Sequence, residues 1–114
     1  MAFSKSLQLK GGDTKYELSP EIKKYTLLDL GFSNTKSGNF AYKKSIDPES
    51  PFSKNAMKLK ITINSDMAEF KMAIVDGNEM NDVDIFSNDK HLEERDQFNF
   101  IMQNMILRKV FRRV

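Results

Sequence analysis

Residues 57–64, MKLKITIN, constrain the fold more than any other stretch of this chain. The apolar side chains of this stretch alternate with polar ones, which is the period of a β-strand with one buried face. Residues 69–75 continue the pattern, with Phe70, Met72 and Ile74 on one side, after the short polar link 65–67. Two such runs joined by a few polar residues predict an antiparallel hairpin.

Three further strands are predicted from weaker patterns. In residues 40–46, Phe40, Tyr42 and Ile46 share one face. Residues 3–9 form a second run, which Gly11 and Gly12 end, and residues 83–86 are predicted as a short edge strand. The sheet content of this chain is therefore built from short elements.

The segment 20–30 fits two structures. Ser19 as cap and Pro20 at the first helical position are typical of a helix start, and Gly31 followed by an apolar residue is typical of a helix end. The residues from about Tyr25 onward also alternate acceptably as a strand. We favour a short helix starting near Pro20, with a strand from Tyr25 as the alternative.

The C-terminal residues predict one long helix. Asn88 or Asp89 can cap its start, and acidic residues then lie near its positive end: Glu93, Glu94 and Asp96. Basic residues are expected at its negative end: Arg108, Lys109, Arg112 and Arg113. Apolar side chains fall on most of its circumference, so we expect sheet to cover it on more than one side.

Composition excludes several kinds of chemistry. The chain has 114 residues, enough for one domain over residues 1–114, and no cysteine, which removes disulfides, thiolate metal sites and cysteine nucleophiles. Its net charge of +2 conceals an acidic block at residues 76–96 beside a basic C-terminus, so nucleic-acid binding is not favoured. No signal peptide or membrane span is evident, so a cytoplasmic location is expected.

Residues 31–40, GFSNTKSGNF, resemble a phosphate-binding loop that lacks a glycine. The P-loop pattern G-x-x-x-x-G-K-[ST] needs a second glycine before the lysine, and a helix after it. Here the predicted strand at residue 40 follows instead. We therefore interpret the stretch as a turn, whose polar groups could still hold a small anion.

Other candidate sites have equally simple explanations. His91, the sole histidine, could act as a general base near Glu94 or Arg95, but at a helix start it is expected to face solvent. The stretch DGNEMNDVD, residues 76–84, offers oxygen ligands but lacks the spacing of an EF-hand, so no metal is expected there. The basic C-terminus could contact RNA weakly, although helix-dipole complementarity explains the same residues.

The sequence as a whole resembles one protein family. GFSNTKSGNFAY, MKLKITIN and the Phe- and Met-rich terminal helix are similar to the bacterial family called domain of unknown function 1831. The resemblance implies an α+β fold in which two small, mainly antiparallel β-sheets pack around one long C-terminal helix. It also implies a role near amino-acid metabolism, sulfur amino acids included, with a small ligand and no agreed catalytic residues.

These observations lead to three functional hypotheses. The first is a cytoplasmic accessory domain that binds a small polar or anionic metabolite, without a cofactor, through Thr35, Lys36, Asn39, Tyr42, His91 and Arg95. The second is a protein-interaction module that binds a metabolic enzyme through the charge-segregated C-terminal region. The third is weak RNA binding. No motif favours an enzyme.

Overall fold

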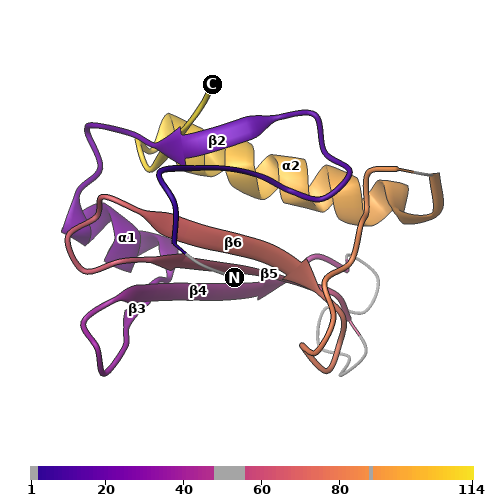
Figure 1. The fold of residues 1–114 in the computed structure, drawn as a ribbon, viewed down its shortest axis with the longest axis horizontal. Helices are drawn as coiled ribbons and strands as arrows, with labels where there is room; N and C mark the ends of the chain where they lie inside the picture. The colour runs from indigo at the N-terminus through magenta and orange to yellow at the C-terminus, as the bar shows by residue number, and fades with distance from the viewer. Residues whose placement is uncertain (1–2, 48–55, 88) are drawn as a thin grey trace.

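Two antiparallel sheets and one long helix make up the fold (Figure 1). The computed structural model describes residues 3–47, 56–87 and 89–114. One sheet has the strand order β1-β2-β7 and the other β3-β4-β5-β6. The strands are β1 (Ser6–Gln8), β2 (Lys15–Leu18), β3 (Ser33–Asn34), β4 (Phe40–Ser45), β5 (Lys58–Ile63), β6 (Phe70–Val75) and β7 (Phe111–Arg113). The helices are α1 (Lys24–Leu30), a 3₁₀ turn η1 (Asp89–His91) and α2 (Leu92–Leu107). The α+β prediction is confirmed.

The alternating residues form the centre of the larger sheet. β5 and β6 pair antiparallel with Ile61 opposite Met72, and both side chains are buried. β4 pairs with β5 on the other side, as predicted, with Phe40 opposite Ile63. One face of this sheet therefore supplies much of the core, because each strand turns every second side chain inward.

The smaller sheet joins the two ends of the chain. β1 lies within the predicted strand 3–9 and ends before Gly11, and it pairs with β2, with Leu7 opposite Tyr16. β2 then pairs with β7, which ends one residue before the C-terminus. The two sheets meet where the Phe70 and Phe111 rings lie 5.0 Å apart.

The strand predicted at residues 83–86 is wrong. Only an isolated bridge between Val75 and Asp82 pairs this part of the chain with a strand. The Asp84 carboxylate instead accepts hydrogen bonds from the backbone N–H groups of Phe86 and Ser87, at 2.8 and 3.1 Å. This side-chain cap bends the backbone away from the sheet.

The helix predicted near residues 20–30 is present, and the alternative strand from Tyr25 is wrong. α1 begins at Lys24, four residues after Pro20. Ser19 does not cap this helix, because its backbone N–H donates to the Val110 carbonyl at 2.9 Å. The Ser19 hydroxyl caps a turn by accepting from Glu21 N–H. Gly31, with a φ of 106°, ends the helix as predicted.

α2 confirms the predicted terminal helix but ends earlier than expected. Asn88 lies outside the described residues; Asp89 begins η1, and Glu93 and Glu94 lie in the first turn of α2. The helix stops at Leu107, so the expectation that Arg112 and Arg113 belong to it is wrong, since both lie in β7. The chain turns at Lys109, whose φ is 65°, and this turn buries the next two side chains, Val110 and Phe111.

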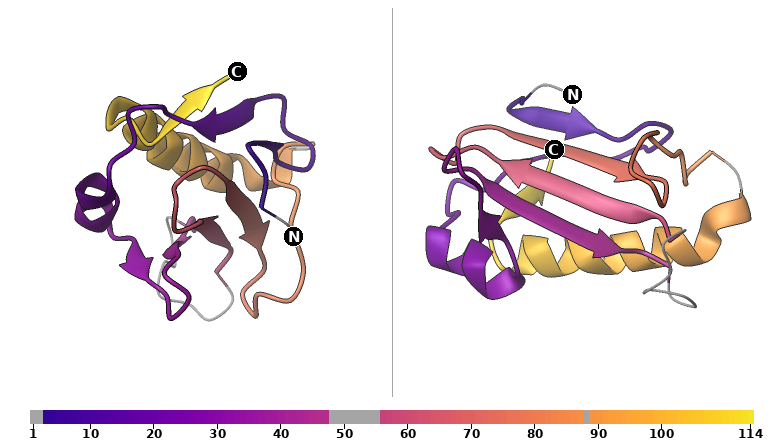
Figure 2. Two further views of the ribbon diagram at one scale, coloured as in Figure 1. Left: turned by 60° about the vertical axis from the view of Figure 1, so that its left-hand side comes forward. Right: turned by 90° about the horizontal axis from the view of Figure 1, so that it is seen from below.

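Only one face of α2 is covered. Its buried side chains are Phe98, Ile101, Met102 and Met105, which face the sheets. Phe100 and Leu107 are 71% and 68% exposed, so the expected cover on more than one side is absent. Figure 2 shows α2 lying along one side of the molecule, with α1 beside its C-terminal part. No helix among the described residues is long and apolar enough to span a bilayer.

Candidate binding cavity

Residues 31–40 form a turn that leads into a strand, as predicted. β3 and β4 pair as a tight hairpin. Thr35 N–H donates to the Asn39 carbonyl at 2.8 Å, and Gly38 N–H donates to the Thr35 carbonyl at 3.0 Å. Because these N–H groups bond within the turn, they do not converge on an anion as the N–H groups of a P-loop do.

The polar side chains of this turn hold the turn together. The Thr35 hydroxyl accepts from Asn39 N–H at 3.2 Å, and Asn39 Oδ1 accepts from Ser65 N–H at 3.1 Å. Lys36 is exposed at the tip. The Tyr42 ring is half-buried against the Phe32 ring, 5.0 Å away, and burial raises its pKa.

His91 and Arg95 lie at the start of α2, far from that turn. In Figure 1 the β3–β4 turn is at the left-hand end of the molecule and the start of α2 is at the right-hand end. His91 lies 3.8 Å from the Glu94 carboxylate. The structure therefore does not bring the six candidate residues into one site.

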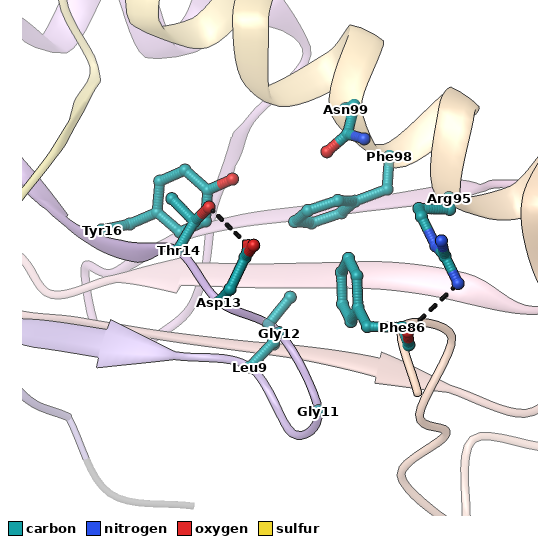
Figure 3. Close-up of a pocket in the computed structure, with 10 residues that line it drawn as sticks. All are labelled: Leu9, Gly11, Gly12, Asp13, Thr14, Tyr16, Phe86, Arg95, Phe98 and Asn99. Carbon is teal, nitrogen blue, oxygen red and sulfur yellow. Dashed lines mark hydrogen bonds between the residues drawn. The ribbon is translucent and has the colours of Figure 1, made fainter. Parts of the chain in front are cut away.

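Arg95 does line a cavity of about 320 Å³. The cavity lies between the β1–β2 connection, the segment at Phe86 and the first half of α2 (Figure 3). Its apolar walls are Leu9, Phe86 and Phe98, and its polar side chains are Asp13, Thr14, Tyr16, Arg95 and Asn99. The volume suits a small metabolite, since ligand pockets begin at roughly 300 Å³.

The aromatic walls are fixed by edge-to-face packing. The Phe98 ring lies 5.5 Å from Phe86 and 6.3 Å from Tyr16, at interplanar angles of 80° and 79°. Arg95 fixes the position of the Phe86 segment: its Nε donates to the Ile85 carbonyl and its Nη2 to the Phe86 carbonyl, both at 3.1 Å. This wall is consequently preformed.

A glycine turn shapes the opposite wall. Gly11 has a φ of 77°, a conformation that glycine adopts without strain, and Gly12 N–H donates to the Leu9 carbonyl at 2.9 Å. The turn presents Asp13 and Thr14 to the cavity, and the Thr14 hydroxyl donates to Asp13 Oδ1 at 3.1 Å (Figure 3).

Two charged side chains and a tyrosine with a raised pKa line the cavity. Burial raises the pKa of Tyr16, the nearby Arg113 opposes this, and Asp13 adds to it. A tyrosine with a raised pKa stays protonated near neutral pH, so its hydroxyl can donate a hydrogen bond but is a poor general base. Asp13 and Arg95 supply opposite charges from opposite walls (Figure 3).

Three acidic side chains of the 76–84 stretch make ion pairs or hydrogen bonds within the fold. Glu79 lies 3.1 Å from Lys43 Nζ and 3.2 Å from Lys60 Nζ, and these contacts lower its pKa. Asp76 accepts from the Asn81 side chain at 3.1 Å, and Asp84 accepts from Ser87, and both pKa values are lowered. Across the described residues, no three His, Asp or Glu side chains are grouped so that they could hold a metal ion.

Of the residues that line the cavity, only Arg95 was predicted from the sequence as a site residue. Asp13, Thr14, Tyr16 and Asn99 were not among the candidates, and Gly11 and Gly12 were interpreted only as the end of a strand. The available signal was the run GGDT, which ends two residues before Tyr16, since a glycine turn can present adjacent polar side chains. Asn99 gave no signal, because it lies on a helix between apolar residues.

Two small antiparallel sheets with one long helix define the chain as an α+β protein. A family model described as "Putative amino acid metabolism" matches residues 1–112, and the chain belongs to this family, DUF1831. A crystal structure of a DUF1831 family protein from Lactobacillus plantarum is 43% identical, with a TM-score of 0.92. The match covers 100% of this chain and 99% of the other. No curated protein is significantly similar to this chain.

Proposed function

We propose that this protein binds a small zwitterionic metabolite of the amino-acid class in the cavity between the β1–β2 connection and α2. The carrying observation is that a carboxylate, Asp13, and a guanidinium, Arg95, line one cavity whose apolar walls are Leu9, Phe86 and Phe98. An α-amino acid carries an ammonium group, a carboxylate and a side chain, and each has a complementary surface here. The family description, "Putative amino acid metabolism", agrees with this ligand class.

Each group of the ligand has a proposed partner. Asp13 accepts from the ammonium group, while Arg95 attracts the carboxylate and Asn99 donates a hydrogen bond to it. The Tyr16 hydroxyl supplies another donor, since its raised pKa keeps it protonated. These roles need no nucleophile and no general base, so the proposal is an accessory binding role in the cytoplasm.

The apolar wall suits a sulfur-containing side chain. Phe86 and Phe98 meet edge to face, so ring edges and faces both line the cavity. A thioether sulfur makes favourable contacts with aromatic rings, worth about 0.3–1.5 kcal/mol. Methionine is therefore expected to bind more tightly than norleucine, its sulfur-free isostere.

A titration with methionine tests the proposal. Binding to the native state raises the unfolding free energy by about 2.7 kcal/mol at a ligand concentration one hundred times the Kd. The wild-type melting temperature should therefore rise by several degrees. Asp13→Asn and Asn99→Ala should each reduce this shift, and both substitute exposed residues, so folding should be preserved.

Lys36→Ala is the matched control, because Lys36 lies in the distant β3–β4 turn. Under the proposal it leaves the methionine shift unchanged. If Lys36→Ala abolishes the shift while Asp13→Asn does not, the ligand site is the turn and not the cavity. If no amino acid moves the melting temperature, the proposed function is wrong.

A further inference from the structure

Three aromatic rings border the cavity between the β1–β2 connection and α2 (Figure 3). Phe98 belongs to α2, Phe86 to the segment after β6, and Tyr16 to β2. The Phe98 ring stands nearly perpendicular to the other two, at 80° to Phe86 and 79° to Tyr16. Perpendicular rings form adjoining walls, so aromatic surface borders the cavity on more than one side.

Phe86 is the ring that a ligand reaches most easily. Phe98 and Tyr16 are 1% and 4% exposed, whereas Phe86 is half-buried. Gly12 lines the same cavity, and a β-carbon at this position would lie 3.6 Å from the Phe86 ring. Because glycine has no side chain, residue 12 leaves this part of the ring uncovered.

The backbone of Phe86 is held without help from its side chain. Its N–H donates to the Asp84 carboxylate at 2.8 Å, and its carbonyl accepts from Arg95 at 3.1 Å. The ring is therefore presented from a fixed position, and a substitution of this side chain preserves both hydrogen bonds.

The Asp13 carboxylate supplies negative charge to the same cavity. In Figure 3 its side chain points toward the space that the three rings border. One of its oxygens accepts from the Thr14 hydroxyl, and among the described residues no lysine or arginine forms an ion pair with it. Its charge is therefore available to a bound cation.

A carboxylate beside aromatic rings suits an organic cation. The face of an aromatic ring carries partial negative charge, so it attracts a cation that lies within about 6 Å of the ring centroid. We propose that the cavity binds the cationic end of its ligand as an N-methylated ammonium group, which packs on the Phe86 ring beside the Asp13 carboxylate. This proposal rests on the proposed function, because it specifies the cationic end of the same amino-acid ligand.

Methylation matters because the side chains of Phe86 and Phe98 carry no oxygen. A primary ammonium has three N–H donors, and any donor that faces these rings loses its hydrogen bond to water without a replacement. A trimethylammonium group has no N–H to satisfy, and its methyl groups can contact the rings directly. A ligand with this group at one end and a carboxylate near Arg95 at the other is a betaine, an N-trimethylated amino acid.

Calorimetric titration of the wild-type protein with two pairs of ligands tests the proposal. The first pair is methionine and N-trimethylated methionine, and the trimethylated form should bind about tenfold more tightly, the usual gain from a desolvated cation on a ring. The second pair is choline and its carbon analogue, in which a quaternary carbon replaces the nitrogen. The two have the same shape, and choline should again bind about tenfold more tightly because only choline is charged.

Substitution of Phe86 locates the contact. Phe86→Leu keeps an apolar wall but removes the aromatic ring, so it should abolish the preference for the trimethylated form over methionine. Phe100→Leu is the matched control, because Phe100 is 71% exposed on α2 and does not line the cavity. This control should keep the wild-type preference. Circular dichroism checks the fold of both variants, and the ligand pairs decide the question in the wild type if Phe86→Leu does not fold.

Three results would overturn the proposal. If methionine binds and trimethylation weakens its binding, the N-methylated ammonium site is absent while the proposed function stands. If the carbon analogue binds as tightly as choline, the cavity recognises shape and not charge. If Phe86→Leu keeps the wild-type preference, the cation does not pack on this ring. Failure of both methionine and its trimethylated form to bind would contradict the proposed function as well.

Discussion

The carboxylate of Asp84 packs directly against the backbone of Gly11, in the space that a β-carbon would need. Gly11 also has a φ of 77°, a conformation that L side chains rarely adopt. The contact joins the β1–β2 turn to the segment that Asp84 caps at Phe86. The two loops flanking the cavity are thus coupled through one glycine.

Gly11→Ala should therefore destabilise the protein by about 2 kcal/mol, because the substitution adds backbone strain and displaces Asp84. Urea denaturation measures this loss. Gly12→Ala is the control: its φ is not positive, and its new β-carbon would lie 3.3 Å from the Leu9 carbonyl and 3.6 Å from the Phe86 ring. A Gly11→Ala loss no larger than that of Gly12→Ala would contradict the explanation.

Phe111→Ala should cost about 3–5 kcal/mol of unfolding free energy, the usual loss for a buried phenylalanine. Phe111 is 1% exposed and its ring packs on Phe70, so it holds the C-terminal strand and the two sheets together. Val114→Ala, three residues later and at an exposed site, should change stability by less than about 0.5 kcal/mol. Equal effects of the two substitutions in chemical denaturation would exclude this role.

Lys109→Gly should raise the unfolding free energy by about 0.5–1 kcal/mol, because Lys109 holds a left-handed φ of 65° at the end of α2. Val110 N–H closes this turn on the Met105 carbonyl at 2.9 Å, so the backbone conformation is imposed by the fold. Lys109→Ala keeps the strain and should bring no gain. Thermal denaturation of the two variants separates relief of strain from loss of the charge.

Stability should fall in acid because of the acidic segment at residues 76–84. Contacts with Lys43 and Lys60 lower the pKa of Glu79 in the fold below its ordinary value of 4.5, and hydrogen bonds lower that of Asp76 below 3.8. A carboxylate with a lowered pKa stabilises the fold fully above its ordinary pKa, and this contribution is lost as pH falls through the folded value. The urea midpoint should consequently decrease below about pH 4.5.

Glu79→Gln should make that decrease shallower, because it removes one of the titrating groups. The substitution should also lower stability at neutral pH. Lys43 and Lys60 lie opposite each other in the sheet, and without the negative charge of Glu79 between them their positive charges repel. Glu21→Gln is the control, because Glu21 lies 3.8 Å from Lys109 with both side chains about two-thirds exposed. A wild-type acid profile in Glu79→Gln would show that other groups cause the acid loss.

Short-range patterns in the sequence determined the centre of this fold. The alternation in β5 and β6 specifies their buried face, because the side-chain period of a strand is two. Gly31 specifies the end of α1, and the acidic residues after Asp89 specify the start of α2. Local sequence also showed that residues 31–40 are a turn and not a phosphate-binding loop, since a strand follows them.

Tertiary contacts decided the remaining elements. β2 and β7 have four and three residues, too few for a pattern, and the partner of Glu17 in their pairing is Arg112, 95 residues away. The end of α2 depends on burying Val110 and Phe111, which outweighs the helix-forming tendency of the basic tail. The cavity follows from the same long-range pairing. Asp13 and Arg95 are brought to one cavity only after β1, β2 and α2 have packed together, so local sequence could not predict their proximity.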